Sequence, residues 1–242
     1  MAIYRMADLN IEIRHRYRYT AGLCRRYRVP DETVPDFTVE PDPNDYAKDK
    51  AACPQFPDGY LEGLSVYRAI ADAILDYHGF LMHASVVERN GKAYAFAAKS
   101  GTGKTTHCRL WLERFDDARI INGDKPLIRF FDGIPYIYGT PWCGNENYEV
   151  NTRSPLSGLC FIERGEHNHI ERLDKAAAVQ RIFTQLLLPK KTERLNTLLD
   201  YVGEMIDVVP CFVLSCNMDP EAAEVSCEAL SKAAEEIRYG QV

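Results

Sequence analysis

Residues 98–106 read Ala-Lys-Ser-Gly-Thr-Gly-Lys-Thr-Thr, a glycine-rich segment that ends in a lysine and two hydroxyl residues. Gly101 and Gly103 let the backbone curl so that successive amide N–H groups point at one anion. A lysine at Lys104 can reach the β- and γ-phosphates of a nucleotide, and the Thr105 hydroxyl can ligate Mg²⁺. The segment is typical of a phosphate-binding loop for ATP or another nucleoside triphosphate. The residues predicted to bind this cofactor are Ser100, Gly101, Thr102, Gly103, Lys104, Thr105 and Thr106.

The match to the full loop pattern departs at one position, because Ala98 stands where a glycine is usual, five residues before Gly103. If that position needs a positive φ, an alanine there is strained. The alternative interpretation is a plain glycine-rich turn beside a helix. We favour a phosphate loop, because a predicted strand precedes the segment and a predicted helix follows it.

A carboxylate near the metal is the second requirement of a phosphate loop. Asp124 follows the apolar strand predicted at 118–122, where such a side chain should project. It could ligate Mg²⁺, or it could accept the proton of an attacking hydroxyl. The plain alternative is a turn aspartate before Lys125 and Pro126. We predict a functional role, as metal ligand or catalytic group.

His83 lies in an apolar strand predicted at 80–88. A histidine in such a strand is more often a hydrogen-bonded core residue. However, Asn90-Gly91 predicts a tight hairpin between this strand and the strand at 92–97 that leads into the phosphate loop. The hairpin can place the ring beside the phosphates, so His83, Lys104 and Asp124 form the predicted catalytic set.

The polar segment 139–148 is predicted to be a loop over the same site. Glu146 could supply a third oxygen ligand, so the predicted metal ligands are Thr105, Asp124 and Glu146. Trp142 could stack on a base or an acceptor, or it could fill the core. The sequence does not decide between these two roles for Trp142.

From residue 61 onward, apolar periodicity alternates between helix and strand spacing. Helices are predicted from about 61 to 75, at 104–114, around 179–187, at 195–202 and from 219 to about 237. Further strands are predicted at 127–131 and 134–138, joined at Asp132-Gly133, and at 156–162 and 211–215. These elements predict an α/β fold with a mixed sheet and flanking helices.

The first sixty residues have a different composition. Residues 11–19 alternate between apolar or aromatic and charged side chains, which predicts a half-buried strand with an arginine face. Residues 30–59 are acidic and proline-rich, which predicts a connector with many loops. We therefore predict a small β-rich subdomain and connector at 1–60 and a nucleotide-binding domain at 61–242. The basic-aromatic stripe could bind a phosphate-bearing partner, but a solvated face is the commoner meaning.

Composition and charge exclude several classes of function. The chain of 242 residues is 46% hydrophobic and 26% charged, which is ordinary for a globular protein. The net charge of −6 makes nucleic acid an unlikely partner. No uncharged stretch approaches the roughly 20 residues of a membrane helix. With no secretory leader and no Cys-x-x-Cys pair among eight cysteines, we expect a cytoplasmic protein with reduced thiols. A homo-oligomer is left open.

Three ordered motifs resemble the catalytic domain of HPr kinase/phosphorylase, which is related to the nucleotide-binding core of ATP-dependent phosphoenolpyruvate carboxykinase. They are His83-Ala-Ser, the segment from Ser100 to Thr106, and Asn122-Gly-Asp124. The resemblance implies transfer of the ATP γ-phosphoryl group to a serine hydroxyl with Mg²⁺. The family usually has two adjacent aspartates where this chain has Gly123-Asp124. The acceptor is accordingly left as a protein, a peptide or a small molecule, and a nucleotide-binding regulatory module with little catalysis is the alternative.

Overall fold

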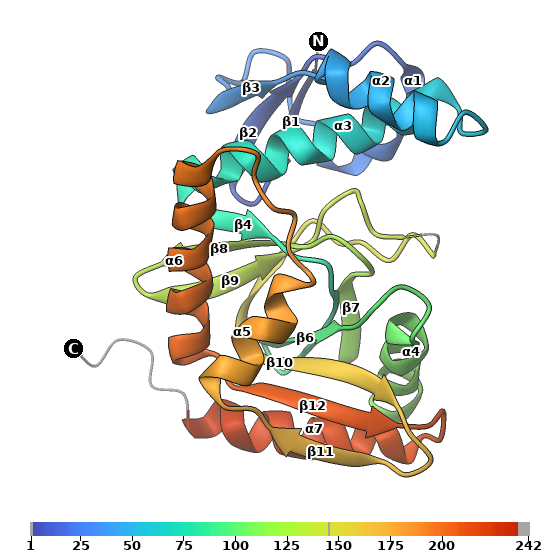
Figure 1. The fold of residues 1–242 in the computed structure, drawn as a ribbon, viewed down its shortest axis with the longest axis vertical. Coiled ribbons are helices and arrows are strands. Elements are labelled where there is room, and N and C mark those ends of the chain that lie inside the picture. The colour runs from blue at the N-terminus through green and yellow to red at the C-terminus, as the bar shows by residue number, and fades with distance from the viewer. Residues whose placement is uncertain (1, 145, 237–242) are drawn as a thin grey trace.

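The structure is a computed structural model of the chain, and it describes residues 2–144 and 146–236. Figure 1 shows a small N-terminal unit, residues 2–77, standing over a larger α/β body. The N-terminal unit carries a sheet of β1 (Ala2–Met6), β2 (Leu9–Ile13) and β3 (Phe37–Val39), in that order. Its helices are α1 (Arg18–Leu23), α2 (Pro43–Ala52) and α3 (Asp58–Ala73), with 3-10 turns at Arg25–Tyr27 and Ile74–Tyr77.

The N-terminal unit corrects two predictions. The strand predicted at 11–19 ends at Ile13, and α1 begins at Arg18. The buried carboxylate of Glu62 accepts hydrogen bonds from the backbone amides of Arg16 and Tyr17, at 2.6 and 3.1 Å, which turns the chain away from the sheet. The connector predicted at 30–59 is more ordered than expected, because it holds β3 and α2.

The large sheet of the described residues has the order β4-β8-β9-β10-β6-β5-β7, and β12 joins β10 with β11 beyond it. Its strands are β4 (Gly79–Leu81), β5 (Ser85–Arg89), β6 (Lys92–Ala97), β7 (Ala118–Asn122), β8 (Leu127–Phe131), β9 (Ile134–Tyr138), β10 (Arg153–Arg164), β11 (His169–Arg172) and β12 (Cys211–Cys216). The strand β10 runs parallel to β6 and β12 but antiparallel to β9. The predicted mixed α/β sheet with a small N-terminal sheet is therefore confirmed.

Both predicted hairpins are confirmed, with turn residues Asn90 and Asp132 at φ of 53° and 52°. The strand predicted at 80–88 is wrong in one respect, because it is broken into β4 and β5. The two pieces have different partners, since β4 pairs with β8 while β5 lies between β6 and β7. His83 therefore lies in the break, where its side chain is not committed to a sheet face.

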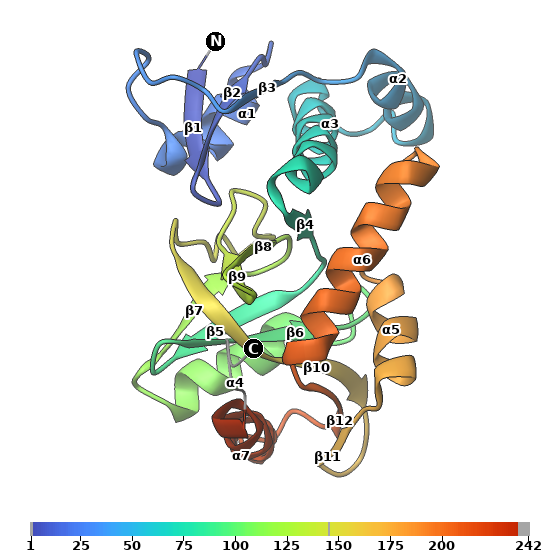
Figure 2. The same cartoon turned by 90° about the vertical axis from the view of Figure 1, so that its left-hand side faces the viewer.

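Helices cover both faces of the sheet. On one face, α5 (Lys175–Phe183) and α6 (Thr192–Val208) pack against alternate residues of β6, namely Ala93, Ala95 and Ala97. On the other face, α4 (Lys104–Arg114) and α7 (Glu221–Glu236) pack against Tyr94 and Phe96. Figure 2 shows α5 and α6 together, away from α4 and α7. The end predicted for the last helix, near Ile237, lies outside the described residues.

The N-terminal unit shares a core with the sheet. Buried side chains of β1, β2 and α3 form one apolar cluster with Leu127 of β8 and Tyr138 of β9. The division predicted between residues 60 and 61 stays a prediction. Of the helices in the described residues, none combines the length and the apolar character needed to cross a membrane. All eight cysteines are free thiols.

A buried histidine gives the fold a measurable pH dependence. Burial lowers the pKa of His107, on α4, from 6.5 to about 4. The unfolded chain binds a proton below pH 6.5 while the folded state does not. The stability that this residue contributes is therefore complete above pH 6.5 and is lost as the pH falls toward 4, by about 3 kcal/mol.

We expect urea denaturation between pH 7 and 4.5 to show a flatter loss of stability in His107→Gln than in the unaltered protein. His169→Gln is the control, because the His169 side chain is 67% exposed. Equal slopes in all three proteins would contradict the assignment.

Candidate functional site

The glycine-rich segment predicted to bind phosphate, here called the phosphate loop, lies between the end of β6 and the start of α4. Gly101 has a φ of 77° and Gly103 a φ of 128°, both in the region that favours glycine. A Cβ built on either residue would meet nothing within 4 Å. Glycine is thus required here by the backbone conformation and not by a lack of space. The side facing these glycines is open to a ligand.

Ala98 is not strained, contrary to the concern that its identity raises. It is absent from the described residues with positive φ, and it is buried. Its carbonyl oxygen accepts a hydrogen bond from Lys104 Nζ at 3.1 Å. The backbone of Ala98 therefore holds the lysine across the loop, and this position does not need glycine.

Lys104 is only 8% exposed. Burial lowers the pKa of its ammonium group, the negative charge of Asp124 opposes this shift, and the positive charge of Lys125 adds to it. Asp124 is therefore an electrostatic neighbour of the loop lysine, as the predicted catalytic set requires. A buried cation held by one carbonyl oxygen is well suited to receive a phosphate oxygen.

Arg164, at the end of β10, braces the loop from outside. Its guanidinium donates to the carbonyl oxygens of Gly101, at 2.6 Å, and Thr102, at 3.3 Å. In a curled loop, the amide N–H groups point away from the carbonyl groups. Because Arg164 holds the carbonyl groups on its own side, the N–H groups are favoured to point to the other side, where an anion can bind. The sequence alone does not reveal this contact, because β10 is distant from the loop in the chain.

Two pockets border the loop, one on each side of Arg164. The first, of about 490 Å³, lies beside Gly103, Thr106 and Leu110, and Asn217 and Met218 also line it. The second, of about 880 Å³, lies beside Lys99 and Ser100 under α5. Their linings share Gly101, Thr102, Ile162 and Arg164.

Asp124 is positioned by a turn that begins at Asn122. The Asn122 side-chain oxygen accepts the amides of Asp124, at 2.9 Å, and Lys125, at 2.8 Å, while its nitrogen donates to the Thr140 carbonyl. An asparagine that caps its own turn in this way fixes the next two residues. The Asn122-Gly-Asp124 motif is thus a rigid exit from β7.

Gly123 is enclosed in this turn. A Cβ built on it would lie 2.2 Å from the carbonyl oxygen of Cys143. That separation is far below contact distance, so any side chain here would force the 139–148 segment away. A second aspartate beside Asp124 does not fit in this backbone arrangement.

His83 and Asp124 are in direct contact. His83 Nε2 lies 2.9 Å from Asp124 Oδ1, and Lys125 Nζ lies 3.2 Å from the same oxygen. Burial acts to raise the pKa of Asp124, but the hydrogen bonds from His83 and Lys125 and the charge of Lys125 outweigh it. The pKa of Asp124 therefore lies below its ordinary value. Among the described residues, Asp124 Oδ2 has no protein partner.

The remaining predicted residues lie at the rim. Thr105 is half-buried in the first turn of α4, and Thr106 is exposed there. Glu146 is exposed and lies 3.4 Å from Arg109. A Cβ built on Gly144 would lie 3.7 Å from Asp124 Cβ and 3.8 Å from Glu146 Oε2, so both carboxylates border Gly144. Within the described residues, no three His, Cys, Asp or Glu side chains form a metal cluster.

Of the two roles considered for Trp142, stacking on a ligand or filling the core, the structure shows the packing role. Its indole nitrogen donates to the carbonyl oxygen of Gly63 at 3.1 Å, and its ring lies 6.0 Å from the ring of Tyr67. Its own carbonyl oxygen accepts the amide of Lys125 at 3.0 Å. Trp142 therefore connects α3 of the N-terminal unit to the turn that carries Asp124.

The comparisons with known proteins place the chain in a family. Residues 61–224 match the model described as SynChlorMet cassette protein ScmC. The chain belongs to the ScmC family. The matched range includes the phosphate loop, His83 and Asp124. No curated protein matches the sequence. Among solved structures, the HPr(Ser) kinase/phosphatase from Coxiella burnetii is similar at 10% identity over 63% of this chain and 97% of that chain, with a TM-score of 0.38.

Adding one methyl group at Gly123 tests whether this residue is enclosed. We expect Gly123→Ala to lower the free energy of unfolding by about 1–3 kcal/mol, because its Cβ meets the Cys143 carbonyl. Urea denaturation measures the change. Gly22→Ala is the matched control, since a Cβ at Gly22, on α1, meets nothing within 4 Å. A Gly123→Ala protein as stable as the unaltered one would refute the contact.

Proposed function

We propose that this ScmC protein binds a nucleoside triphosphate with Mg²⁺ and transfers its γ-phosphoryl group to a hydroxyl acceptor. The observation that carries the proposal is that β5 pairs with the ends of β6 and β7, which brings the glycine loop with Lys104 and the His83–Asp124 pair to one edge of the sheet. Anion-binding amides and a buried lysine suit phosphates. A carboxylate with one free oxygen suits a hydroxyl proton or a metal.

The orientation of the nucleotide follows from the loop. In phosphate loops, the loop amides cradle the α- and β-phosphates, and the lysine reaches the β- and γ-phosphates. The nucleoside then extends past Thr106 into the pocket of about 490 Å³. This arrangement directs the γ-phosphoryl group toward His83 and Asp124, away from the nucleoside.

The donor atoms near the lysine fit Mg²⁺, which prefers oxygen ligands and often takes only one or two from the protein. The Thr105 hydroxyl would hold the ion directly, and Asp124 would hold it through a water molecule, which leaves Asp124 Oδ2 for a proton. Glu146 borders the same space. When bound, Mg²⁺ neutralises charge on the β- and γ-oxygens. The absence of a cluster of three such side chains in the described residues is compatible with an ion that is held largely by phosphates.

The transfer step can be written with the residues present. The acceptor oxygen attacks the γ-phosphorus, the bond between this phosphorus and the β,γ-bridging oxygen breaks, and the nucleoside diphosphate leaves. The acceptor proton passes to Asp124 Oδ2, because Oδ1 is occupied by His83 and Lys125. His83 fixes the carboxylate, and Lys104 with the loop amides stabilises charge on the transferred group.

The alternative function is a nucleotide-binding regulatory module with little or no catalysis. The observation that favours it is the enclosed Gly123, which leaves Asp124 without a neighbouring second acid. Incubation with labelled ATP and Mg²⁺ distinguishes the two functions. Nucleotide binding without hydrolysis or transfer would support the module.

We expect Lys104→Ala to weaken ATP binding at least tenfold, because a charge-assisted contact to the phosphates is lost. Isothermal titration calorimetry with ATP and Mg²⁺ measures the affinity. Lys232→Ala, an exposed change on α7, is the control and should bind as the unaltered protein does. ATP affinity unaffected by Lys104→Ala would reject the site.

We expect Asp124→Asn to keep ATP binding within a few fold while turnover falls by about 10²–10⁴-fold. Because the pKa of Asp124 is lowered, the carboxylate stays ionised at a lower pH than an ordinary aspartate does. Turnover should therefore persist at mildly acidic pH. Steady-state rates from pH 5 to 8 test both points. Turnover that falls with a midpoint near pH 6, or an Asn variant with full activity, would contradict this role.

A further inference from the structure

The N-terminal unit presents a surface of arginines and aromatic rings that the proposed function does not use. We call it the arginine–tyrosine face, and it consists of Arg16, Tyr17, Arg18, Tyr19, Phe56 and Tyr60. The side chains of Tyr17, Tyr19 and Phe56 are 38%, 46% and 40% exposed. Tyrosine and arginine are enriched in protein interfaces, and aromatic rings in solvent usually mark a contact surface.

The face is held rigidly from below. Glu62 on α3 is 2% exposed, and it accepts hydrogen bonds from the amides of Arg16 and Tyr17 and from the Thr20 hydroxyl at 2.8 Å. Gly59 lets α1 approach α3 closely, because a Cβ there would lie 2.7 Å from Tyr19 Cβ. A buried carboxylate and a glycine contact are a costly way to hold a surface turn, which indicates that its shape matters.

The rings form a continuous row. The Phe56 and Tyr60 ring centroids are 4.9 Å apart, and those of Tyr60 and Tyr19 are 6.1 Å apart. A Cβ on Gly63 would lie 3.4 Å from Tyr19 Cε1, and Gly63 accepts the Trp142 indole hydrogen bond. The row thus runs from the tip of the N-terminal unit to the segment beside Asp124.

Among the described residues, the two arginines of the face form no ion pair, and the nearby Asp58, which accepts a hydrogen bond from Tyr17, pairs with Lys50. By contrast, Arg26 pairs with Glu149 and Arg28 with Asp31. Unpaired arginines beside aromatic rings attract carboxylates and can bind them in a bidentate manner. The chain as a whole carries −6, so this face is a local exception to its charge.

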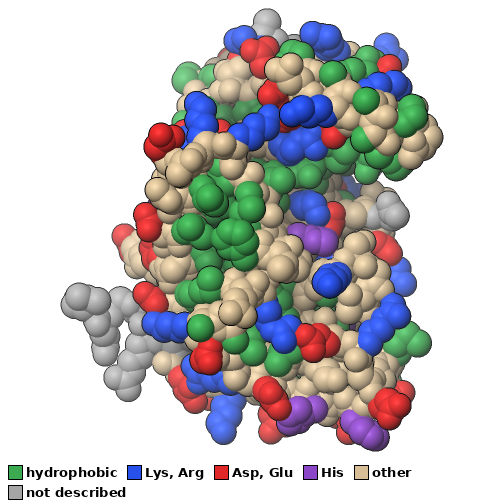
Figure 3. Space-filling view, viewed as in Figure 1, with side chains coloured by type: hydrophobic (Ala, Val, Ile, Leu, Met, Phe, Trp, Pro, Cys, Tyr) green, Lys and Arg blue, Asp and Glu red, His purple; other side chains and the backbone are tan. Residues whose placement is uncertain are grey.

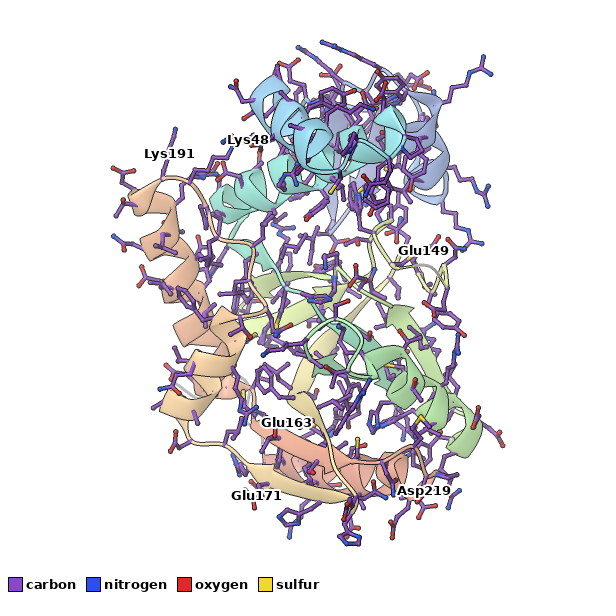
Figure 4. The ribbon with its side chains drawn as sticks, turned by 45° about the vertical axis from the view of Figure 1, so that its right-hand side comes forward. Lys48, Glu149, Glu163, Glu171, Lys191 and Asp219 are labelled. Atoms are coloured by element: carbon purple, nitrogen blue, oxygen red, sulfur yellow. The ribbon has the colours of Figure 1, made fainter. Side chains whose placement is uncertain are left out.

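The face adjoins the proposed site. Figure 3 shows a hollow between the N-terminal unit and the body, and Figure 4 shows Glu149 in the segment below that unit. Burial raises the pKa of Tyr19, with smaller contributions from Tyr60 and from Cys143 of the 139–148 segment. Trp142 connects the same place to the Asp124 turn through the Lys125 amide.

We propose that the arginine–tyrosine face docks an acidic peptide segment, and that this segment carries the hydroxyl which accepts the phosphoryl group. The inference rests on the proposed function and specifies its acceptor. A peptide bound along the row would extend toward Trp142, whose carbonyl oxygen accepts the Lys125 amide in the turn that carries Asp124. Carboxylates of the segment would pair with Arg16 and Arg18.

The test uses the full chain, ATP and Mg²⁺ with a peptide library in which serine is fixed at the centre and all other positions vary. The phosphorylated products are sequenced. We expect the unaltered protein to select Asp and Glu on one side of the serine, by at least fivefold over Lys and Arg. The double variant Arg16→Glu with Arg18→Glu should invert this preference.

The double variant Arg5→Glu with Lys232→Glu is the charge-matched control, because both side chains are exposed and have no ion-pair partner in the described residues. It should keep the acidic preference. Tyr19→Ala is an independent variant that should raise the peptide KM with little change in ATP hydrolysis. Circular dichroism melting shows whether each variant is folded.

The outcomes separate the two proposals. ATP hydrolysis without transfer to any peptide, or transfer with no acidic preference, overturns the docking proposal and leaves nucleotide turnover intact. No ATP binding or hydrolysis overturns the proposed function itself. A preference that ignores the Arg16 and Arg18 reversal, in variants that melt as the unaltered protein does, shows that another surface selects the acceptor.

Discussion

The pairing of β5 on both of its edges is the constraint on which the site depends. Ser85 at the start of β5 lies opposite Phe96 near the end of β6, and Val86 lies opposite Asn122 at the end of β7. Because β5 runs antiparallel to both neighbours, its beginning meets their ends. His83, the phosphate loop and Asp124 are therefore gathered at one edge of the sheet, with separations set by backbone hydrogen bonds.

Much of this arrangement is readable from the sequence, and what is missed has a physical reason. The glycines of the loop and the Asn90-Gly91 hairpin are local signals, so the positions of β6, α4 and β7 could be predicted. Non-local contacts leave weaker traces. The capture of the Arg16 and Tyr17 amides by Glu62, 46 residues away, overrides the alternating pattern of residues 11–19. Arg164 braces the loop in the same non-local manner.

The turn after β7 carries one carboxylate, that of Asp124, because a side chain does not fit at Gly123. The Cys143 carbonyl occupies the volume of a Gly123 side chain, while Trp142 holds the same segment to α3. The turn thus lies in close contact with the segment that Trp142 attaches to the N-terminal unit. The unit that carries the arginine–tyrosine face is thereby joined to the Asp124 turn by direct contacts, and under the proposed function these would hold a bound acceptor in a fixed position relative to Asp124.

The way in which Glu62 is satisfied has a consequence for behaviour in salt. Its carboxylate accepts hydrogen bonds from two backbone amides and a hydroxyl inside the protein and has no ion-pair partner in the described residues. Mobile ions have little access to such contacts, whereas attraction between exposed charges weakens as the Debye length shortens. Rising ionic strength would then release an acidic partner from α1 while α1 keeps its place on α3. The position of α1 on α3 and the binding of an acidic partner thus respond to salt independently.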